Sequence, residues 1–102
     1  MSSKWVRLGS VRRFDNVTPD KEQALKPLEE AAEVFGVYQR FYECPTKTNE
    51  ELLLAECADV IQATLNLVAA LGVEDFRPYL KECERRNRER GRITDGRPGD
   101  GE

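Results

Sequence analysis

The feature that most constrains the fold is one long apolar segment at residues 52–71, LLLAECADVIQATLNLVAAL, which contains no proline or glycine. Its apolar residues recur with the period of an α-helix. The four residues before it, TNEE at positions 48–51, have the form of a capping box that opens a helix. Gly72 follows as a C-terminal glycine. The segment therefore predicts a long helix with one main apolar stripe.

Two further helices are predicted, one on each side of this segment. The first covers about residues 18–42, with Thr18 as its N-cap and a proline at its first helical position. Pro27 is expected to kink or restart this helix, because proline lacks an N–H and its ring crowds the preceding turn. The third covers about residues 74–90 and ends at Gly91.

The chain is predicted to be one all-α domain, an antiparallel helical bundle, over residues 18–91. Residues 1–17 are expected to form an N-terminal arm, either extended or as a weak strand. Residues 92–102 are rich in glycine, proline and charge, which predicts a disordered tail. A chain of 102 residues buries only about two thirds of its unfolded surface. Oligomerisation would therefore help it, and a second subunit is expected to complete the bundle.

Composition excludes several classes of function. The net charge is −3, from 16 basic and 19 acidic residues, which argues against a nucleic-acid binder. The absence of histidine removes histidine-based catalysis and histidine-ligated zinc. Three cysteines without a C-x-x-C pair indicate free thiols in a reducing compartment. No segment is expected to be a signal peptide or a membrane span, so the prediction is a soluble cytoplasmic protein without a membrane partner.

Four acidic residues stand out by their positions on the predicted helices. On the first helix Glu30 and Glu33 lie outside both the solvated face and the stripe formed by Leu28, Ala31, Ala32, Phe35, Tyr38 and Tyr42. On the second helix Glu56 and Asp59 flank the main stripe, which includes Cys57 as a core residue. Acidic residues three positions apart project side by side from one helix face. Each pair therefore has the spacing that lets two carboxylates share one ion.

Each pair taken singly is also compatible with an ordinary solvated face, since helices carry many glutamates there. Two pairs on consecutive helices, each among apolar neighbours, favour a cation site instead. Four carboxylates gathered in a partly apolar setting repel one another and lose hydration, and a divalent cation would offset both effects. Oxygen ligands alone favour Mg²⁺, with Mn²⁺ as the alternative, over zinc.

The two pairs, Glu30-Ala-Ala-Glu33 and Glu56-Cys-Ala-Asp59 with twenty-two residues between them, resemble the E-x-x-E…E-x-x-D signature of the all-α NTP pyrophosphatase superfamily. The chain looks most like MazG-like proteins of that superfamily, which also contains phosphoribosyl-ATP pyrophosphohydrolase and dimeric dUTPase relatives. The flanking segments LEEAAEVFGVYQ, ELLLAECADVIQATLNLVAALG and KECERRNRERGR resemble the helices of such chains. The resemblance covers roughly residues 20–92.

The resemblance implies a Mg²⁺-dependent pyrophosphohydrolase that splits the α–β bond of a nucleoside triphosphate into a nucleoside monophosphate and pyrophosphate, with modified nucleotides among its substrates. It implies that Glu30, Glu33, Glu56 and Asp59 are the metal ligands and catalytic residues, one of them orienting the attacking water. It also implies a homodimer or homotetramer. The alternative is a helical interaction or regulatory module that keeps the fold without catalysis.

Other polar residues are candidates for binding the nucleotide. Lys81, Arg85 and Arg88 fall at i, i+4 and i+7 on one face of the third helix and would contact phosphates. An exposed, salt-bridged surface explains them equally well. Asn66, on the same flank as Asp59, would meet the ribose or base, or else form a polar edge of the bundle. Trp5 is expected to cover the bundle as an apolar residue, or else to stack on a base.

Overall fold

The computed structural model describes residues 4–94, and over this range it contains three helices and no strand. They are α1 (Lys21–Glu43), α2 (Lys47–Ala70) and α3 (Arg77–Glu89). The predicted all-helical class is confirmed. The chain divides into two compact units, residues 1–72 and 73–102, so the predicted domain spans both. Most of the predicted tail, residues 95–102, lies outside the described residues.

Helix α1 begins two residues later than predicted. Its N-cap is Asp20, not Thr18, and the Asp20 carboxylate accepts a hydrogen bond from the Gln23 backbone N–H at 2.9 Å. The Thr18 hydroxyl instead donates to that carboxylate at 2.6 Å. Pro27 does not restart the helix: α1 continues across it, and the missing proline N–H removes one backbone hydrogen bond of the helix.

Helix α2 begins at Lys47, so the predicted capping box at residues 48–51 is wrong. The N-cap is Thr46, whose hydroxyl accepts from the Asn49 backbone N–H at 3.1 Å. The side chain of Asn49 turns back and donates to the Cys44 carbonyl at 2.8 Å. These two bonds fix the short connector between α1 and α2, which runs only from Cys44 to Thr46.

Thr46→Ala is expected to lower the free energy of unfolding by about 1 kcal/mol, because the Asn49 N–H loses its only side-chain acceptor. Urea denaturation followed by circular dichroism measures this change. Thr48→Ala is the matched control, since Thr48 lies inside the first turn and caps nothing in the structure. An equal or larger loss with Thr48→Ala would restore the capping box and contradict the observed N-cap.

The prediction that Gly72 and Gly91 follow the C-terminal ends of the second and third helices is confirmed. Gly72 and Gly91 both have positive φ angles, 85° and 75°, just after the ends of α2 and α3. Beyond α3 the Arg92 N–H donates to the Asn87 carbonyl and the Gly91 N–H to the Arg88 carbonyl. This pattern closes a helix on a left-handed glycine. Helix α3 starts three residues later than predicted, with Pro78 in its first turn.

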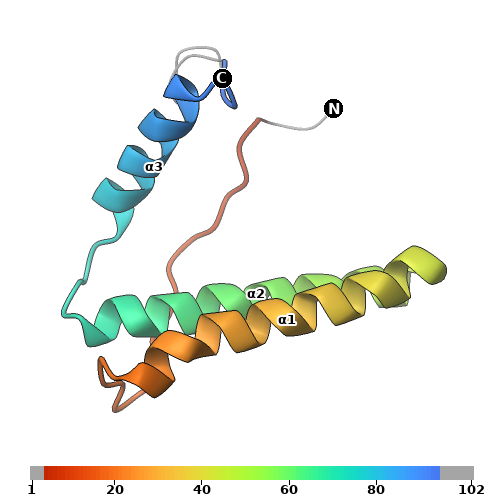
Figure 1. The fold of residues 1–102 in the computed structure, drawn as a ribbon, viewed down its shortest axis with the longest axis horizontal. Coiled ribbons are helices and arrows are strands. Elements are labelled where there is room, and N and C mark those ends of the chain that lie inside the picture. Colours follow the sequence, from red (N-terminus) through yellow and green to blue (C-terminus); the bar gives the residue numbers. More distant parts are fainter. Residues whose placement is uncertain (1–3, 95–102) are drawn as a thin grey trace. The chain divides into compact units, whose positions relative to one another are not determined.

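Helices α1 and α2 lie side by side and run in opposite directions, joined by the short connector (Figure 1). The half-buried residues of α1 recur at alternating intervals of four and three, which is the seam spacing of coiled coils. They are Gln23, Pro27, Glu30, Val34, Val37 and Phe41. Glu56 of α2 is also half-buried, as is Cys57. Glu30 therefore occupies a seam position that an aliphatic residue would ordinarily take.

The apolar stripe expected to pack α1 lies on its exposed face. Phe35 is 60% exposed and Tyr42 75%, and the rings of Phe35, Tyr38 and Tyr42 stand in a row with centroids 6.3 and 6.2 Å apart. Within the described residues only Ala63 and Asn66 are buried. The physical reason is that two helices make one seam, so within residues 4–72 the second apolar face of α1 packs against no other helix.

The N-terminal arm contains no helix or strand over residues 4–17, and two side chains of α2 hold it. Asn66 accepts from the Phe14 backbone N–H, and Gln62 donates to the Arg12 carbonyl, each at 3.0 Å. Asn66 is 3% exposed, so its interpretation as a polar edge is wrong: it is an interior anchor of the arm.

Helix α2 is long and apolar enough, by length and composition alone, to cross a membrane. We expected no segment with the length and apolar composition of a membrane span, and for α2 this expectation is wrong. Core helices of soluble proteins satisfy the same measures, and Glu56 and Asp59 would be costly in hydrocarbon. The cytoplasmic location stays a prediction.

Candidate metal centre

Three carboxylates meet across the seam between α1 and α2. Glu30 and Glu33 stand one turn apart on α1, and Glu56 comes from α2. Each contributes an oxygen atom, and these three oxygens all lie within 4.8 Å of one another. Glu30 and Glu56 are half-buried and Glu33 is exposed at the edge of the seam. The arrangement has the spacing at which three carboxylates can ligate one cation.

One oxygen of this cluster, Glu56 Oε2, is buried without a hydrogen-bond partner in the part of the chain that the structure describes. A buried carboxylate oxygen left unpaired is unfavourable, because it has lost its water and gained no donor. A cation bound by the three carboxylates would supply the missing partner.

The surroundings oppose ionisation of two members of the cluster. Burial raises the pKa of the Glu30 carboxyl above its usual value of 4.5, and the charges of Glu33, Asp59 and Glu56 raise it further. Burial likewise raises the pKa of Glu56, with the charges of Glu33 and Asp59 adding to the effect. Without a cation, the cluster therefore favours bound protons.

These raised pKa values predict how stability depends on pH in the absence of metal. The folded protein holds Glu30 and Glu56 more favourably when they are protonated than when they are ionised. Their protonated forms therefore stabilise the fold fully below pH 4.5, and this stabilisation is lost as the pH rises through their folded-state pKa values. In EDTA, wild type is expected to lose thermal stability relative to Glu56→Gln as the pH rises from about 4 to about 8. A difference in Tm that stays constant over this range would contradict the prediction.

Asp59, the fourth predicted ligand, is exposed and does not belong to the group of three oxygens. It is close enough for its charge to raise the pKa of both Glu30 and Glu56. It also lines a pocket together with Glu30. The structure thus brings three of the four predicted ligands together and places the fourth beside them.

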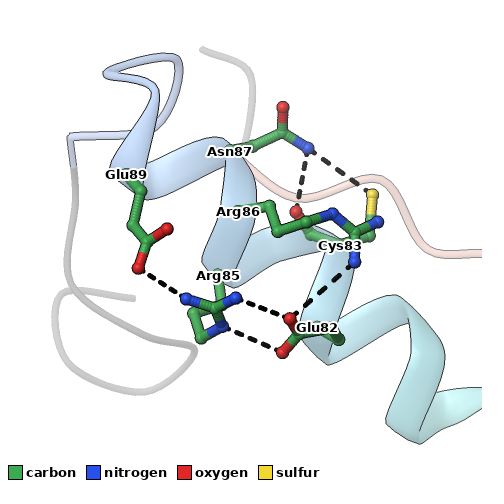
Figure 2. Close-up of polar contacts among 6 residues, drawn as sticks. All are labelled: Glu82, Cys83, Arg85, Arg86, Asn87 and Glu89. Carbon is green, nitrogen blue, oxygen red and sulfur yellow. Dashed lines mark hydrogen bonds and ion pairs between the residues drawn. The ribbon is translucent and has the colours of Figure 1, made fainter.

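The predicted phosphate-binding residues lie on α3, in the second unit. Arg85 donates hydrogen bonds to Glu82 at 2.6 and 2.9 Å and to Glu89 at 2.5 Å. Figure 2 shows Arg85 between these two carboxylates. This pairing lowers the pKa of Glu82 and raises that of Arg85. Arg88 pairs with Glu84 at 2.9 Å, and Lys81 is exposed. Two of the three cations thus have carboxylate partners within α3, and their contact with phosphates stays a prediction.

Sequence reasoning missed Gln62, which bonds both the arm and Asn66. A signal was present: Asp59, Gln62 and Asn66 are polar residues at intervals of three and four in the predominantly apolar second half of the helix. Such a line of polar residues indicates a helix face that does not pack in the apolar seam with α1. In the structure that face meets the arm and a pocket.

The chain matches no protein-family model, no curated protein and no solved structure. The resemblance to MazG-like proteins therefore remains a prediction from the two acidic pairs and their flanking residues. The arrangement of the carboxylates is the independent observation on which a proposal can be built.

Proposed function

We propose that this chain is a Mg²⁺-dependent nucleoside triphosphate pyrophosphohydrolase of the MazG-like type. The observation that carries the proposal is the carboxylate cluster, in which three oxygens lie within 4.8 Å of one another and Glu56 Oε2 is buried without a partner. Carboxylate oxygens are the ligands that Mg²⁺ and Mn²⁺ prefer. The residues present therefore fit a hard divalent cation.

In this proposal Glu30, Glu33 and Glu56 hold the ion, which when bound neutralises triphosphate charge and makes a bound water more acidic. Asp59 stands beside the cluster and is exposed, so it is placed to accept a proton from the attacking water. The water oxygen forms a bond to the α-phosphorus as the bond to the bridging oxygen breaks. The products are a nucleoside monophosphate and pyrophosphate. The choice of the α–β bond comes from the family resemblance.

A second copy of the chain is part of the proposal. The row formed by Leu28, Phe35, Tyr38 and Tyr42 exposes a continuous apolar face on α1. Monomeric proteins seldom expose large contiguous apolar patches. Pairing this face with its copy would bury it and complete an antiparallel bundle, as a homodimer or as half of a homotetramer. Each carboxylate cluster would then lie within an assembled bundle.

The test is the product formed from nucleoside triphosphates by the purified chain. Release of pyrophosphate that requires Mg²⁺ and stops in EDTA supports the proposal, and release of orthophosphate contradicts it. A panel of ordinary and modified triphosphates identifies the preferred base and sugar.

A non-catalytic interaction module is the second candidate, and the pairing of Arg85 and Arg88 within α3 favours it, since these cations already have acidic partners. This candidate predicts a dimer without turnover. Calorimetric titration separates the two: no Mg²⁺ binding at millimolar concentration, with or without a triphosphate, favours the module.

A further inference from the structure

A pocket of about 440 Å³ adjoins the carboxylate cluster between the arm, the start of α1 and the second half of α2. Phe14 of the arm, Glu30 of α1, and Asp59, Gln62 and Asn66 of α2 contribute to its lining. Its volume falls in the range of about 300–1,000 Å³ that is usual for small-molecule sites. Because Glu30 and Asp59 line it, the pocket is continuous with the proposed metal centre.

Backbone groups fix the orientation of two side-chain amides in this pocket. The Phe14 backbone N–H can only donate, so the Asn66 atom that it meets at 3.0 Å must be the oxygen, Oδ1. The Arg12 carbonyl can only accept, so the Gln62 atom that it meets must be Nε2. Gln62 Nε2 also donates to Asn66 Oδ1 at 3.0 Å. The usual ambiguity of amide orientation is thereby removed.

This network leaves one donor and one acceptor without partners. Both Nε2 hydrogens of Gln62 are used, and within residues 4–94 no hydrogen bond involves Gln62 Oε1 or Asn66 Nδ2. Asn66 is 3% exposed, and its unpaired Nδ2 is not among the buried unpaired atoms of the described residues, so solvent reaches this donor. Both side chains line the pocket, one helical turn apart. The pocket thus presents an N–H donor beside a carbonyl acceptor.

We propose that this pocket binds the nucleobase of the substrate, with Asn66 Nδ2 donating to a ring acceptor and Gln62 Oε1 accepting from the neighbouring N–H. The proposal rests on the proposed function for the identity of the ligand as a nucleotide. Every nucleobase carries an acceptor next to an N–H donor on one edge, which matches this pair. Phe14 lines the same pocket and offers a ring against which a base can stack.

The charge of the pocket favours a neutral group over a phosphate. Its lining carries four carboxylates, from Asp20, Glu22, Glu30 and Asp59, and one cation, Lys26. Lys26 itself pairs with Glu29 at 3.3 Å. An excess of negative charge repels a triphosphate but admits an uncharged base. The phosphates would then lie toward the carboxylates that hold the ion.

Nucleosides test the pocket without phosphate or metal. In EDTA, millimolar adenosine, cytidine, uridine or inosine is added to ¹⁵N-labelled protein, and the side-chain amide signals of Asn66 are followed by NMR. At least one nucleoside is expected to shift these signals, whereas ribose is expected to leave them unchanged. The assignment is overturned if no nucleoside moves them or if ribose moves them equally.

Asn66→Asp is the sharpest variant, because the aspartate keeps an oxygen for the Phe14 N–H, replaces the Nδ2 donor by an acceptor and adds a negative charge to the pocket. Nucleoside affinity is expected to fall about tenfold or more. Should this variant fail to fold, Phe14→Ala keeps the backbone N–H and removes the ring, with a loss of about tenfold expected. Val6→Ala, an exposed arm residue outside the pocket lining, is the control with unchanged affinity. Wild-type affinity in the folded Asn66→Asp or Phe14→Ala protein contradicts the assignment.

The failure of this proposal is distinguishable from the failure of the proposed function. Nucleoside binding at Asn66 without pyrophosphate release from any triphosphate would support the pocket and refute the hydrolase. Mg²⁺-dependent hydrolysis with an Asn66 amide that no nucleoside disturbs would support the hydrolase and refute the pocket.

Discussion

Replacing Glu56 by glutamine is expected to reduce Mg²⁺-dependent pyrophosphate release by at least about 100-fold. Loss of a group that merely supports a metal ligand costs about 10–100-fold, so loss of a ligand should reach at least the upper end of that range. The same change removes the buried, unpartnered charge of Glu56 Oε2, so the metal-free protein should become more stable above pH 4.5. Steady-state kcat/KM and thermal denaturation in EDTA measure the two effects.

The opposite signs of these effects distinguish a lost ligand from a damaged fold. Glu51→Gln is the matched control, since Glu51 is exposed near the start of α2 and lies outside the cluster. It should retain wild-type activity. If Glu56→Gln kept full activity with its fold intact, the carboxylate cluster would not be the catalytic centre.

If the chain assembles as proposed, Phe35→Glu is expected to yield monomers and to lower the Tm. Phe35 is 60% exposed in the isolated chain, and its ring stacks near that of Tyr38 on the face proposed to meet a second copy. Burying an unpaired carboxylate there would cost more than the association gains. Light scattering coupled to size-exclusion chromatography measures the mass. Because few residues are buried within one chain, dissociation and loss of stability should occur together.

Gly36→Glu supplies the control for added charge. Gly36 is next to Phe35, and a Cβ there meets no atom within 4 Å, so the new side chain is accommodated on the solvated side of α1. This variant is expected to keep the wild-type mass. If Phe35→Glu also kept it, the exposed row of α1 would not be the interface.

The number of helices and their ends were predictable because Gly72 and Gly91 are local signals: each adopts a positive φ that glycine tolerates best. The starts of α1 and α2 were less predictable. Thr18 and Asp20 are both good caps, as are Thr46 and Thr48, and the choice between them depends on where the connector and the seam place the first turn.

The periodicity of the sequence also could not identify which face of α1 packs against α2. Leu28, Phe35 and Tyr42 form one apolar row, while Val34, Val37 and Phe41 form another. A period of 3.6 residues identifies both rows equally well. In the structure the row that carries Glu30 is the half-buried one, and it forms the seam with α2.

The candidate site was predictable in its carboxylates and not in its pocket. Helix geometry places Glu30 beside Glu33 on one helix. Their meeting with Glu56 of the next helix was predicted from the two acidic pairs taken together and from the family resemblance. The bond from the Phe14 N–H to Asn66 joins residues 52 positions apart, and no local pattern encodes such a contact. The arm, which creates the pocket, could be placed only from the structure.

The spacing of the half-buried residues of α1 has a geometric consequence. Intervals of four and three average 3.5 residues, fewer than the 3.6 of a straight helix, so a seam kept over this length imposes a left-handed superhelix. The exposed row Leu28, Ala31, Phe35, Tyr38 and Tyr42 has the same intervals and must wind with the same pitch. A partner helix can therefore follow α1 from Leu28 to Tyr42. A rotation of α1 about its axis changes both its seam with α2 and the position of its exposed row. The same rotation moves Glu30 and Glu33 relative to Glu56. Contact with a partner helix on the exposed row would therefore be coupled to the distances between the carboxylates.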